Sequence, residues 1–373
     1  MNSQKDFSRY DRQTILQGFG RDGQQKLFNA SVLVIGAGGL GCPALQYLVA
    51  SGVGQIGIVD DDTVTLSNLH RQILFTSEDI GMAKVDVAAR RLHQMNPEVS
   101  LTPYSVRLDV SNALDIISTY DIVLDGTDNF SSRYMINDAC ALLQKPLVFG
   151  AVSQFEGQVS VFNVPDSNGK KSNYRDLFPE APGDDKIPNC AQAGVIGVLP
   201  GIVGTMQAAE VIKLITGLGT PLAGKLLTFN ILTNLFYEVA FSSSTETKSL
   251  IPVDKQEFEN MHYQQACGVD DRTIVEIDAQ QLKDLLLTPS TLVIDVRAEN
   301  EMPRLKGFDH MVVPMPRFYN EIDTIDAHNV ILVCQHGIRS MYAAELLQEE
   351  NPGIKKLYSL KGGVSRWALE LDL

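Results

Sequence analysis

The chain has 373 residues, of which 45 are acidic and 31 basic, giving a formal net charge of −14. So acidic a surface repels phosphate backbones, and we expect no nucleic-acid partner. No basic N-terminal segment leads into an apolar run and no stretch of eighteen apolar residues occurs, which argues against secretion and against a membrane-spanning segment. The five cysteines are scattered and odd in number, which favours a reducing compartment, and we expect a cytoplasmic protein.

Residues 1–30 are polar and are predicted to be helical. They include Arg12, in the sequence RYDRQ. Taken alone, this arginine is most simply a solvated residue on a helix face.

The stretch from Ser31 to Asp60 predicts a nucleotide-binding unit. A β-branched run is followed by the glycine-rich turn GAGGLG, an apolar helix and a second strand. Gly36 allows a tight turn, Gly38 lets the backbone approach a phosphate, and Gly41 lets helix and strand pack closely. The amides at the helix start then face the anion, and Asp60 is placed to accept hydrogen bonds from ribose. A nicotinamide dehydrogenase would share all of these features.

A polar turn after the second strand favours a triphosphate over a dinucleotide. It contains Asn68, Arg71 and Gln72, and Lys84 follows near the start of a helix predicted over residues 77–97. A pyrophosphate already satisfied by backbone amides does not need two further cations and an amide, whereas a triphosphate does.

After a third strand predicted over residues 101–106, a fourth, over residues 122–124, leads into a candidate magnesium site. The sequence DIVLDGTDN brings Asp125 and Asp128 to the carboxyl end of a strand, where open α/β sheets bind their ligands. Mg²⁺ in phosphoryl sites takes one or two carboxylates, so Asp128 is a candidate ligand. Strands and helices continue to alternate, which predicts a Rossmann-like, doubly wound, mostly parallel sheet.

An irregular segment over residues 165–189 ends at Cys190, just before a helix predicted over residues 195–218. Long irregular segments inside a domain are usually functional, and a thiolate is favoured just before a helix start. Strands predicted at 225–231 and 236–240 close a first domain of residues 1–245. A Ser-rich change of composition follows, and residues 246–271 are interpreted as a linker with little regular structure.

Residues 272–373 predict a second, smaller α/β domain. The strand VILVC runs directly into CQHGIRS, so that Cys334 ends a strand and is followed by a glycine, Arg339 and a helix start. Loop amides, the helix dipole and the arginine together favour a thiolate at Cys334.

These motifs resemble two families. Over residues 5–240 the chain is similar to the MoeB/ThiF family, relatives of ubiquitin-activating enzymes, through RYDRQ, GAGGLG, DDDTVTLSNLHRQ, Lys84, DGTDN and NCAQAG. Over residues 272–373 the pattern DVR…CxxGxRS…GGxxxW resembles a rhodanese domain.

The first resemblance implies that ATP is held by residues of the glycine turn, the polar turn and the helix after it: Gly38, Gly39, Asp60, Asn68, Arg71, Gln72 and Lys84. It implies that Mg²⁺ binds Asp128 and that Arg12 reaches the phosphates of the neighbouring subunit in a homodimer. The partner is a ubiquitin-like sulfur carrier protein ending in Gly-Gly, whose C-terminal glycine the family adenylates.

The second resemblance implies that Cys334 carries a persulfide and that Arg339 orients the donor or the partner. The sulfur donor, a cysteine desulfurase or thiosulfate, is left open. Joined in one chain, the two activities imply synthesis of a carrier thiocarboxylate, as in molybdopterin or thiamine biosynthesis. We hypothesise that Cys190 resolves the acyl-disulfide by forming a disulfide with Cys334.

The chain departs from the first family at its structural zinc. Many members bind zinc through two CxxC pairs, but here NYRD (Asn173–Asp176) takes the place of the first pair, and only Cys267 stands near the second. Tetrahedral zinc needs four ligands, so we predict no zinc.

Three alternatives remain open: a family member that activates another acyl or tRNA substrate, a nicotinamide-dependent oxidoreductase, and a scaffold with a degenerate site. The net charge and the rhodanese-like domain argue against the first. The polar turn, Lys84 and Asp128 argue against the second, and the intact motifs argue against the third.

Overall fold

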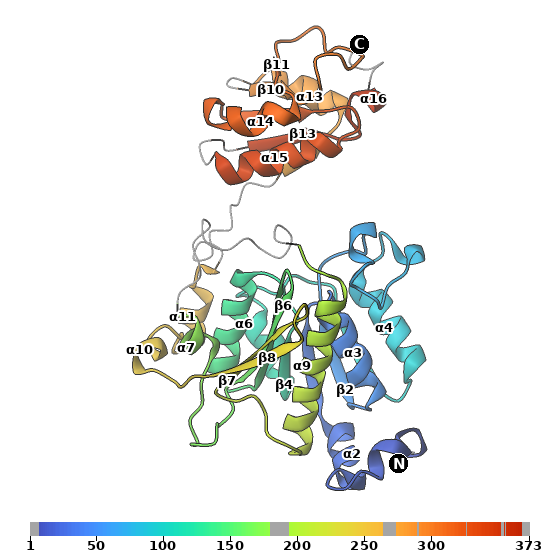
Figure 1. Ribbon diagram of the computed structural model, residues 1–373, viewed down its shortest axis with the longest axis vertical. Coiled ribbons are helices and arrows are strands. Elements are labelled where there is room, and N and C mark those ends of the chain that lie inside the picture. The colour runs from blue at the N-terminus through green and yellow to red at the C-terminus, as the bar shows by residue number, and fades with distance from the viewer. Residues whose placement is uncertain are drawn as a thin grey trace. The chain divides into compact units, whose positions relative to one another are not determined.

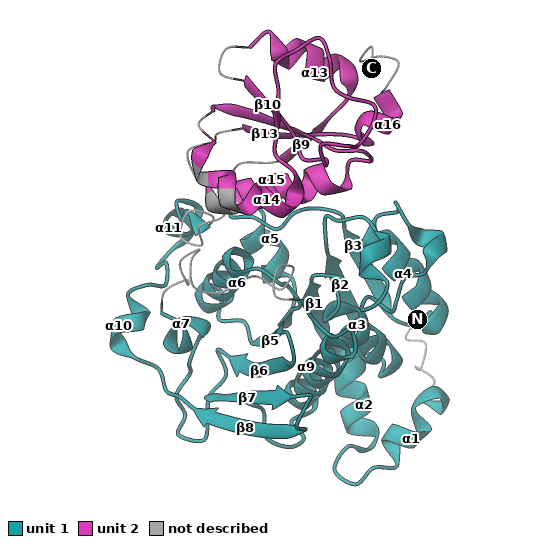
Figure 2. Cartoon of the chain, turned by 45° about the horizontal axis from the view of Figure 1, so that its top comes forward, with its two compact units in different colours: residues 1–269 teal, residues 270–373 magenta. Residues whose placement is uncertain are grey.

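The computed structural model describes residues 7–179, 194–263, 274–288, 291–325, 327–351, 354 and 356–367. The chain divides into two compact units, Met1–Val269 and Asp270–Leu373, which Figure 2 shows in different colours. Each unit is built on its own sheet and is described separately.

Unit 1 is built on an eight-stranded sheet in the order β3-β2-β1-β4-β5-β6-β7-β8. The first five strands in this order are parallel and the last three are antiparallel. The predicted doubly wound, mostly parallel fold is therefore confirmed. The strands are β1 (Ser31–Ile35), β2 (Gln55–Val59), β3 (Ser100–Tyr104), β4 (Ile122–Asp125), β5 (Leu147–Ser153), β6 (Glu156–Phe162), β7 (Lys225–Asn230) and β8 (Leu235–Ala240).

Helices cover both faces of this sheet (Figure 1). One core contains side chains of α3 (Gly41–Ala50), α4 (Lys84–Met95) and α9 (Val198–Thr216), and the other contains those of α5 (Ala113–Ser118) and α6 (Phe130–Leu142). Among the described residues, only α9 is long and apolar enough to cross a bilayer. It packs on α3, β5 and β6, and a helix buried in a protein core can have the same length and composition. The other helices before α4 are α2 (Gly20–Asn29) and the short elements η1 (Ser8–Tyr10), α1 (Asp11–Thr14), η2 (Leu66–Asn68) and η3 (Ser77–Asp79).

The helix expected over residues 77–97 begins later than predicted. Thr76 and Asp79 form a reciprocal capping box around η3, and Gly81 follows with a φ of +87°. These features break the helix pattern, so that α4 starts at Lys84 itself.

The C-terminal part of unit 1 is more ordered than the predicted linker. Its described part contains α10 (Thr245–Lys248) and α11 (Lys255–Glu259), and residues 264–273 lie outside the described part. Phe258 is fully buried and packs with Tyr263 in the α5–α6 core. This segment is therefore an integral part of unit 1 up to Tyr263.

Unit 2 is a five-stranded parallel sheet in the order β11-β10-β12-β13-β9. Helices α14 and α15 contribute to one core and α13 and α16 to the other, so both faces are covered. Its elements are β9 (Ile274–Ile277), α13 (Ala279–Leu286), β10 (Thr291–Asp295), β11 (Met311–Val312), α14 (Met315–Glu321), η4 (Ile322–Thr324), β12 (Asn329–Val333), α15 (Ile338–Glu350), β13 (Lys356–Leu360) and α16 (Gly363–Trp367).

Candidate functional site

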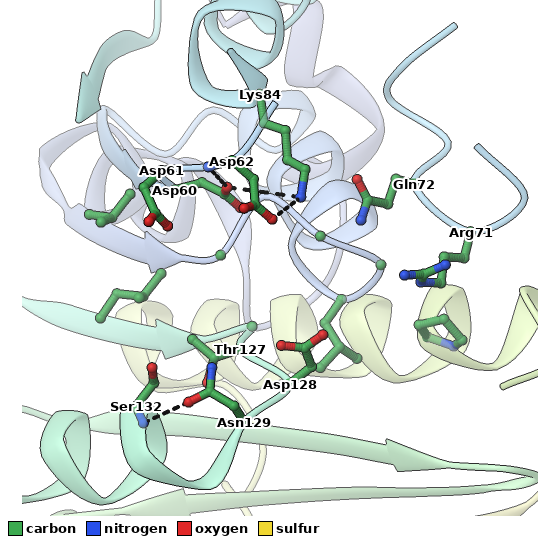
Figure 3. Close-up of a pocket in the computed structure, with 18 of the residues that line it drawn as sticks. Asp60, Asp61, Asp62, Arg71, Gln72, Lys84, Thr127, Asp128, Asn129 and Ser132 are labelled. Carbon is green, nitrogen blue, oxygen red and sulfur yellow. Dashed lines mark hydrogen bonds and ion pairs between the residues drawn. The ribbon is translucent and has the colours of Figure 1, made fainter. Parts of the chain in front are cut away.

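A cavity of about 670 Å³ lies at the carboxyl ends of β1, β2 and β4 in unit 1. The direction in which successive strands are added to the sheet reverses here, because β2 lies on one side of β1 and β4 lies on the other. Open α/β sheets bind their ligands at such a point. Figure 3 shows the acidic run after β2 and Lys84 across the cavity from the turn that contains Thr127, Asp128 and Asn129. The structure thus brings together residues from three separate segments.

The glycine-rich turn has the close approaches that its spacing predicts. Gly36 has a φ of +94°, and a Cβ there would lie 2.8 Å from the carbonyl oxygen of Gly126. A Cβ on Gly41 would lie 1.8 Å from the carbonyl oxygen of Gly36. Gly38 and Gly39 line the cavity, whereas Gly41 holds the turn against the helix start. The turn therefore presents bare backbone to the cavity.

Asp60 fixes this turn to the end of β2. Its carboxylate accepts hydrogen bonds from the amides of Ala37, at 2.7 Å, and Asp62, at 2.9 Å. Burial raises the pKa of Asp60, and nearby Lys84 partly opposes that rise. Asp60 lines the cavity, so the same carboxylate can also accept from a ribose hydroxyl.

Two cations and an amide line the cavity beside the glycine-rich turn and Asp60. Lys84 is buried, and its Nζ lies 2.7 Å from Asp62 Oδ2. Arg71 donates from Nη1 to the carbonyl of Ser67, at 3.1 Å. Gln72 is buried, and its Oε1 has no hydrogen-bond partner among the described residues. An unsatisfied acceptor beside the glycine turn is suited to a ligand that carries a donor.

The two aspartates after β4 have different environments. Asp128 is exposed to the cavity, as a metal ligand would be. Asp125 is buried and accepts from the amide and hydroxyl of Thr127, at 2.9 and 2.6 Å. Burial raises the pKa of Asp125, and the guanidinium of Arg133 acts in the opposite direction. Asp125 therefore shapes the turn that places Asp128.

Sequence reasoning missed two residues of this site. Asp62, which holds Lys84, could have been found from its position two residues after Asp60 in a run of three aspartates. Arg133 is 7% exposed, lines the cavity, and stacks over the rings of Phe130 and Phe149. Nothing in the sequence distinguishes it from an ordinary arginine of a surface helix.

Besides Gly41, two predicted nucleotide-binding residues are not among those that line the cavity. Arg12 is exposed on α1. Asn68 ends η2, and its Oδ1 accepts from the amide of Thr65 at 3.4 Å. Cys190 lies in the segment 180–193, outside the described residues.

The segment in the place of the first CxxC pair is held by polar contacts. Arg175 donates from Nε and Nη2 to the two carboxylate oxygens of buried Asp138, at 2.8 and 2.7 Å, and Tyr263 donates to the same carboxylate at 2.9 Å. Asp176 accepts from the amide of Ser244, at 2.9 Å, and from the hydroxyl of Thr247.

Unit 2 has a second candidate centre around Cys334, which follows β12 and is buried. Its Sγ accepts a hydrogen bond from the amide of Gly337 at 3.1 Å and lies 3.3 Å from the hydroxyl of Ser340. Gly337 has a φ of +88°, a conformation that turns the loop amide toward the sulfur. Arg339, in the first turn of α15, pairs with Glu301.

Models of two known families match the chain, one for each unit. The ThiF family matches residues 10–250, and the rhodanese-like domain matches residues 278–370. The chain belongs to the ThiF family. Its C-terminal part is a rhodanese-like domain.

Two relatives named both adenylyltransferase and sulfurtransferase are similar over nearly the whole chain, and a third relative is similar over part of it. The probable adenylyltransferase/sulfurtransferase MoeZ of Mycobacterium tuberculosis is 38% identical, over 99% of this chain and 95% of its own length. The adenylyltransferase and sulfurtransferase MOCS3 of Drosophila virilis is 35% identical, over 98% and 84%. The sulfur carrier protein adenylyltransferase of Thermus thermophilus is 53% identical, over 62% and 85%.

Solved structures share the fold of unit 1. A crystal structure of E. coli MccB with ATP is similar with a TM-score of 0.56 and 24% identity, over 65% of this chain and 74% of that chain. E. coli MccB with MccA-N7isoASN has a TM-score of 0.57 and 23% identity, over the same 65% and 74%.

Proposed function

We propose that this ThiF-family chain activates a ubiquitin-like sulfur carrier protein in two reactions. Unit 1 adenylates the C-terminal glycine of a carrier that ends in Gly-Gly, and unit 2 supplies the sulfur that converts it to a thiocarboxylate. The observation that carries the proposal is the pairing, in one chain, of a glycine-turn cavity lined by Lys84, Arg71 and Asp128 with a buried cysteine held by a loop amide. Relatives similar over the whole chain are named for both activities.

ATP binds along the cavity, with its phosphates on the backbone of Gly38 and Gly39 and its ribose on Asp60. Arg71 and Lys84 neutralise charge on the phosphates, Gln72 helps to orient them, and Asn68 holds the polar turn that presents these side chains. The exposed carboxylate of Asp128 and the phosphate oxygens fit the ligand set that Mg²⁺ prefers. Bound there, Mg²⁺ would neutralise charge on the phosphates.

In the first reaction the carrier carboxylate attacks the α-phosphorus, and pyrophosphate leaves with the electron pair of the broken bond. The fixed cations and the turn amides stabilise the charge that develops on the phosphates. In a homodimer, Arg12 of one subunit reaches the phosphates bound by the other; its exposure on α1 is compatible with that role.

In the second reaction the terminal sulfur of a Cys334 persulfide attacks the acyl-adenylate, and AMP leaves. The product is an acyl-disulfide on Cys334. The thiolate of Cys190 then attacks Cys334 Sγ, which forms a Cys190–Cys334 disulfide and releases the thiocarboxylate. An external dithiol reduces that disulfide before the next cycle.

The protein acts in the cytoplasm and folds without zinc, and its sulfur comes from a cysteine desulfurase or thiosulfate.

The test is carrier-dependent ATP–pyrophosphate exchange with candidate carriers ending in Gly-Gly. We expect exchange with one carrier in the wild type and none in Asp128→Ala or without Mg²⁺. Asp115→Ala is the matched control, because Asp115 is a solvent-exposed aspartate on α5. ATP binding without exchange for any carrier would point to another acyl substrate. No ATP binding at all would overturn the proposal.

The sulfur steps have a separate test. Cys334→Ala is expected to keep exchange but form no thiocarboxylate. Cys190→Ala is expected to stall with the carrier attached to Cys334, and full turnover by this variant would remove Cys190 from the mechanism. Metal analysis of purified protein tests the absence of zinc.

A further inference from the structure

Two buried serines form a chain of hydroxyls that ends at the sulfur of Cys334. The hydroxyl of Ser340, in α15, lies 3.3 Å from Cys334 Sγ, and the hydroxyl of Ser359, in β13, lies 2.9 Å from the Ser340 hydroxyl. All three residues are buried, with at most 1% of their surface exposed. The hydroxyls are therefore shielded from water and depend on one another for hydrogen bonds.

The direction of donation along this chain follows from a count of protons. Each serine has one hydroxyl proton, and a buried hydroxyl needs an acceptor for it. Among the described residues, the hydrogen-bond partner of the Ser359 hydroxyl is the oxygen of Ser340, so Ser359 donates to Ser340. Ser340 keeps its own proton for the carbonyl oxygen of Gly337, at 3.1 Å, or for the sulfur of Cys334.

The charge on Cys334 decides between these two acceptors. As a thiol, Cys334 donates to the Ser340 oxygen, and Ser340 donates to the Gly337 carbonyl. As a thiolate, the sulfur is the better acceptor, because a hydrogen bond to a charged partner is about twice as strong as a neutral one. Ser340 then donates to the sulfur, as the amide of Gly337 does at 3.1 Å. Ser359 donates to Ser340 in both states, and this polarises Ser340 into a stronger donor.

We propose that Ser359 is a positioning residue of the sulfur-transfer centre, which acts through Ser340 to stabilise the thiolate of Cys334. This inference rests on the proposed function, because that function needs Cys334 as a thiolate each time the cysteine accepts a sulfur. When the thiolate forms, the thiol proton leaves to the solvent. Both serines keep their protons, and only the acceptor of the Ser340 proton changes.

The charged and titratable side chains around this centre stay the same when a serine is replaced. They are His336 in the cysteine loop, Arg339 with its partner Glu301, Arg297 with its partner Asp295, Lys361 with its partner Glu276, and Arg366 on α16. A difference in thiolate formation between serine variants therefore reports the hydroxyls and not these charges.

The experiment follows the ionisation of Cys334 in the full chain through the ultraviolet absorbance of the thiolate as the pH is varied. The absorbance of Cys334→Ala at each pH is subtracted, so that the tyrosines and the other four cysteines do not contribute. Ser340→Ala removes a hydrogen bond to a charged sulfur, and we expect the titration midpoint to rise by about 1–2 pH units. Ser359→Ala only weakens that bond, and we expect a rise of about 0.2–0.6 of a unit.

A double variant tests whether Ser359 acts through Ser340. In the Ser340→Ala background, Ser359 has no hydroxyl to polarise, so we expect Ser359→Ala to cause no further shift of the midpoint. An effect of packing alone would be the same in both backgrounds. Ser359→Thr keeps a hydroxyl at this position and is expected to titrate as the wild type.

Ser365→Ala is the matched control. The Ser365 hydroxyl accepts from the side chain of Gln335 in the same loop, at 2.8 Å, and among the described contacts it is not hydrogen-bonded to the sulfur. We expect this variant to titrate as the wild type. A shift as large as that of Ser359→Ala would overturn the inference, because the position of the loop would then set the midpoint.

The inference and the proposed function fail in different ways. If Ser359→Ala leaves the midpoint unchanged, or shifts it equally with and without the Ser340 hydroxyl, the inference is wrong while the proposed function stands. If Cys334→Ala still yields the carrier thiocarboxylate, the sulfur-transfer part of the proposed function fails. The comparison of Ser359→Ala, Ser359→Thr and the wild type needs no change at Ser340, so the inference stays testable even if Ser340→Ala folds poorly.

Discussion

The ammonium group of Lys84 lies 2.7 Å from the carboxylate of Asp62, inside the cavity at the carboxyl ends of the unit 1 strands. Lys84 is almost fully buried, while the Asp62 side chain is 69% exposed, and a second carboxylate, that of Asp60, is 4.0 Å from the same Nζ. The cation is thus oriented by acidic partners before a phosphate arrives. A bound phosphate must compete with Asp62 for it.

This competition predicts opposite effects for two substitutions. Lys84→Met is expected to raise the Kd for ATP at least about tenfold, since charged hydrogen bonds contribute about 1.5–3 kcal/mol. Asp62→Asn is expected to lower it a few-fold. Calorimetric titration with ATP measures both, and Lys225→Met is the control because Lys225 is a surface lysine on β7. Equal weakening in both cavity variants would show that Asp62 supports binding instead of competing with it.

Substitutions at two glycines of the glycine-rich turn are expected to have different effects, one on ATP binding and the other on the stability of the fold. A Cβ on Gly38 would have its nearest neighbour 3.8 Å away, at Gln72 Nε2, so Gly38→Ala is expected to fold normally and bind ATP more weakly. A Cβ on Gly41 would overlap the Gly36 carbonyl oxygen, and Gly41→Ala is expected to lower the free energy of unfolding by about 1–3 kcal/mol. Urea unfolding and ATP titration on both variants separate the two effects. Normal stability of Gly41→Ala would contradict the packing role.

The Asp138–Arg175 pair predicts a large loss of stability. Burial raises the pKa of Asp138 and Arg175 opposes the rise, so Arg175→Met leaves a buried carboxylate without its cation. We expect the free energy of unfolding to fall by about 3–5 kcal/mol. Because Asp138 would then bind a proton more readily in the folded state, part of this loss is expected to be recovered as the pH is lowered.

Denaturant unfolding at several pH values measures this effect. Lys225→Met is the control, since Lys225 and its partner Glu238 are both about half-exposed, and a surface pair contributes at most about 1 kcal/mol. Similar losses in the two variants would mean that the buried pair has no special structural role.

The Glu301–Arg339 pair predicts an acid-sensitive contribution to the stability of unit 2. Arg339 lowers the pKa of Glu301 to about 2, below the ordinary pKa of a glutamate. The pair therefore contributes its full stabilisation at pH values above that ordinary pKa, and this contribution is lost as the pH falls toward 2. Between about pH 4.5 and 2, the free energy of unfolding is expected to fall further in the wild type than in Glu301→Gln, because only the wild type has this carboxylate to protonate. The chain has a single tryptophan, Trp367, and it lies in unit 2, so its fluorescence reports unfolding of that unit. Parallel acid unfolding curves for the two proteins would contradict the prediction.

The sequence predicts most accurately the positions of residues that depend only on spacing along a short stretch of chain. The first strand, the glycine turn and Asp60 follow from a β-branched run, a fixed glycine pattern and the length of one helix, all within thirty residues. The cavity wall also includes Arg71, Gln72, Lys84 and Asp128, as expected from their motifs. Whether these residues act as proposed remains a prediction.

The parts that depend on distant contacts could not be predicted. Phe258 and Tyr263 occur in a polar stretch whose composition is typical of a linker. They are core residues because they pack on the apolar surface of α5 and α6, which lie more than a hundred residues earlier in the chain. The buried position of Arg133 likewise depends on the ring of Phe149, which comes from the next strand of the sheet. A single sequence shows the composition of such segments but not the surfaces they meet.

The strand order of unit 2 also has a consequence for synthesis of the protein. β9 is the first strand of the unit, but it lies at the edge of the sheet, and among the described strands it is hydrogen-bonded only to β13, the last one. On the ribosome, β9 therefore emerges before its partner strand and must wait until β13 has been translated. The strands of unit 1 are all complete by Ala240, so its sheet can close while unit 2 is still being made. A premature stop just before β13 would leave the sheet of unit 1 intact and deprive β9 of its partner in unit 2.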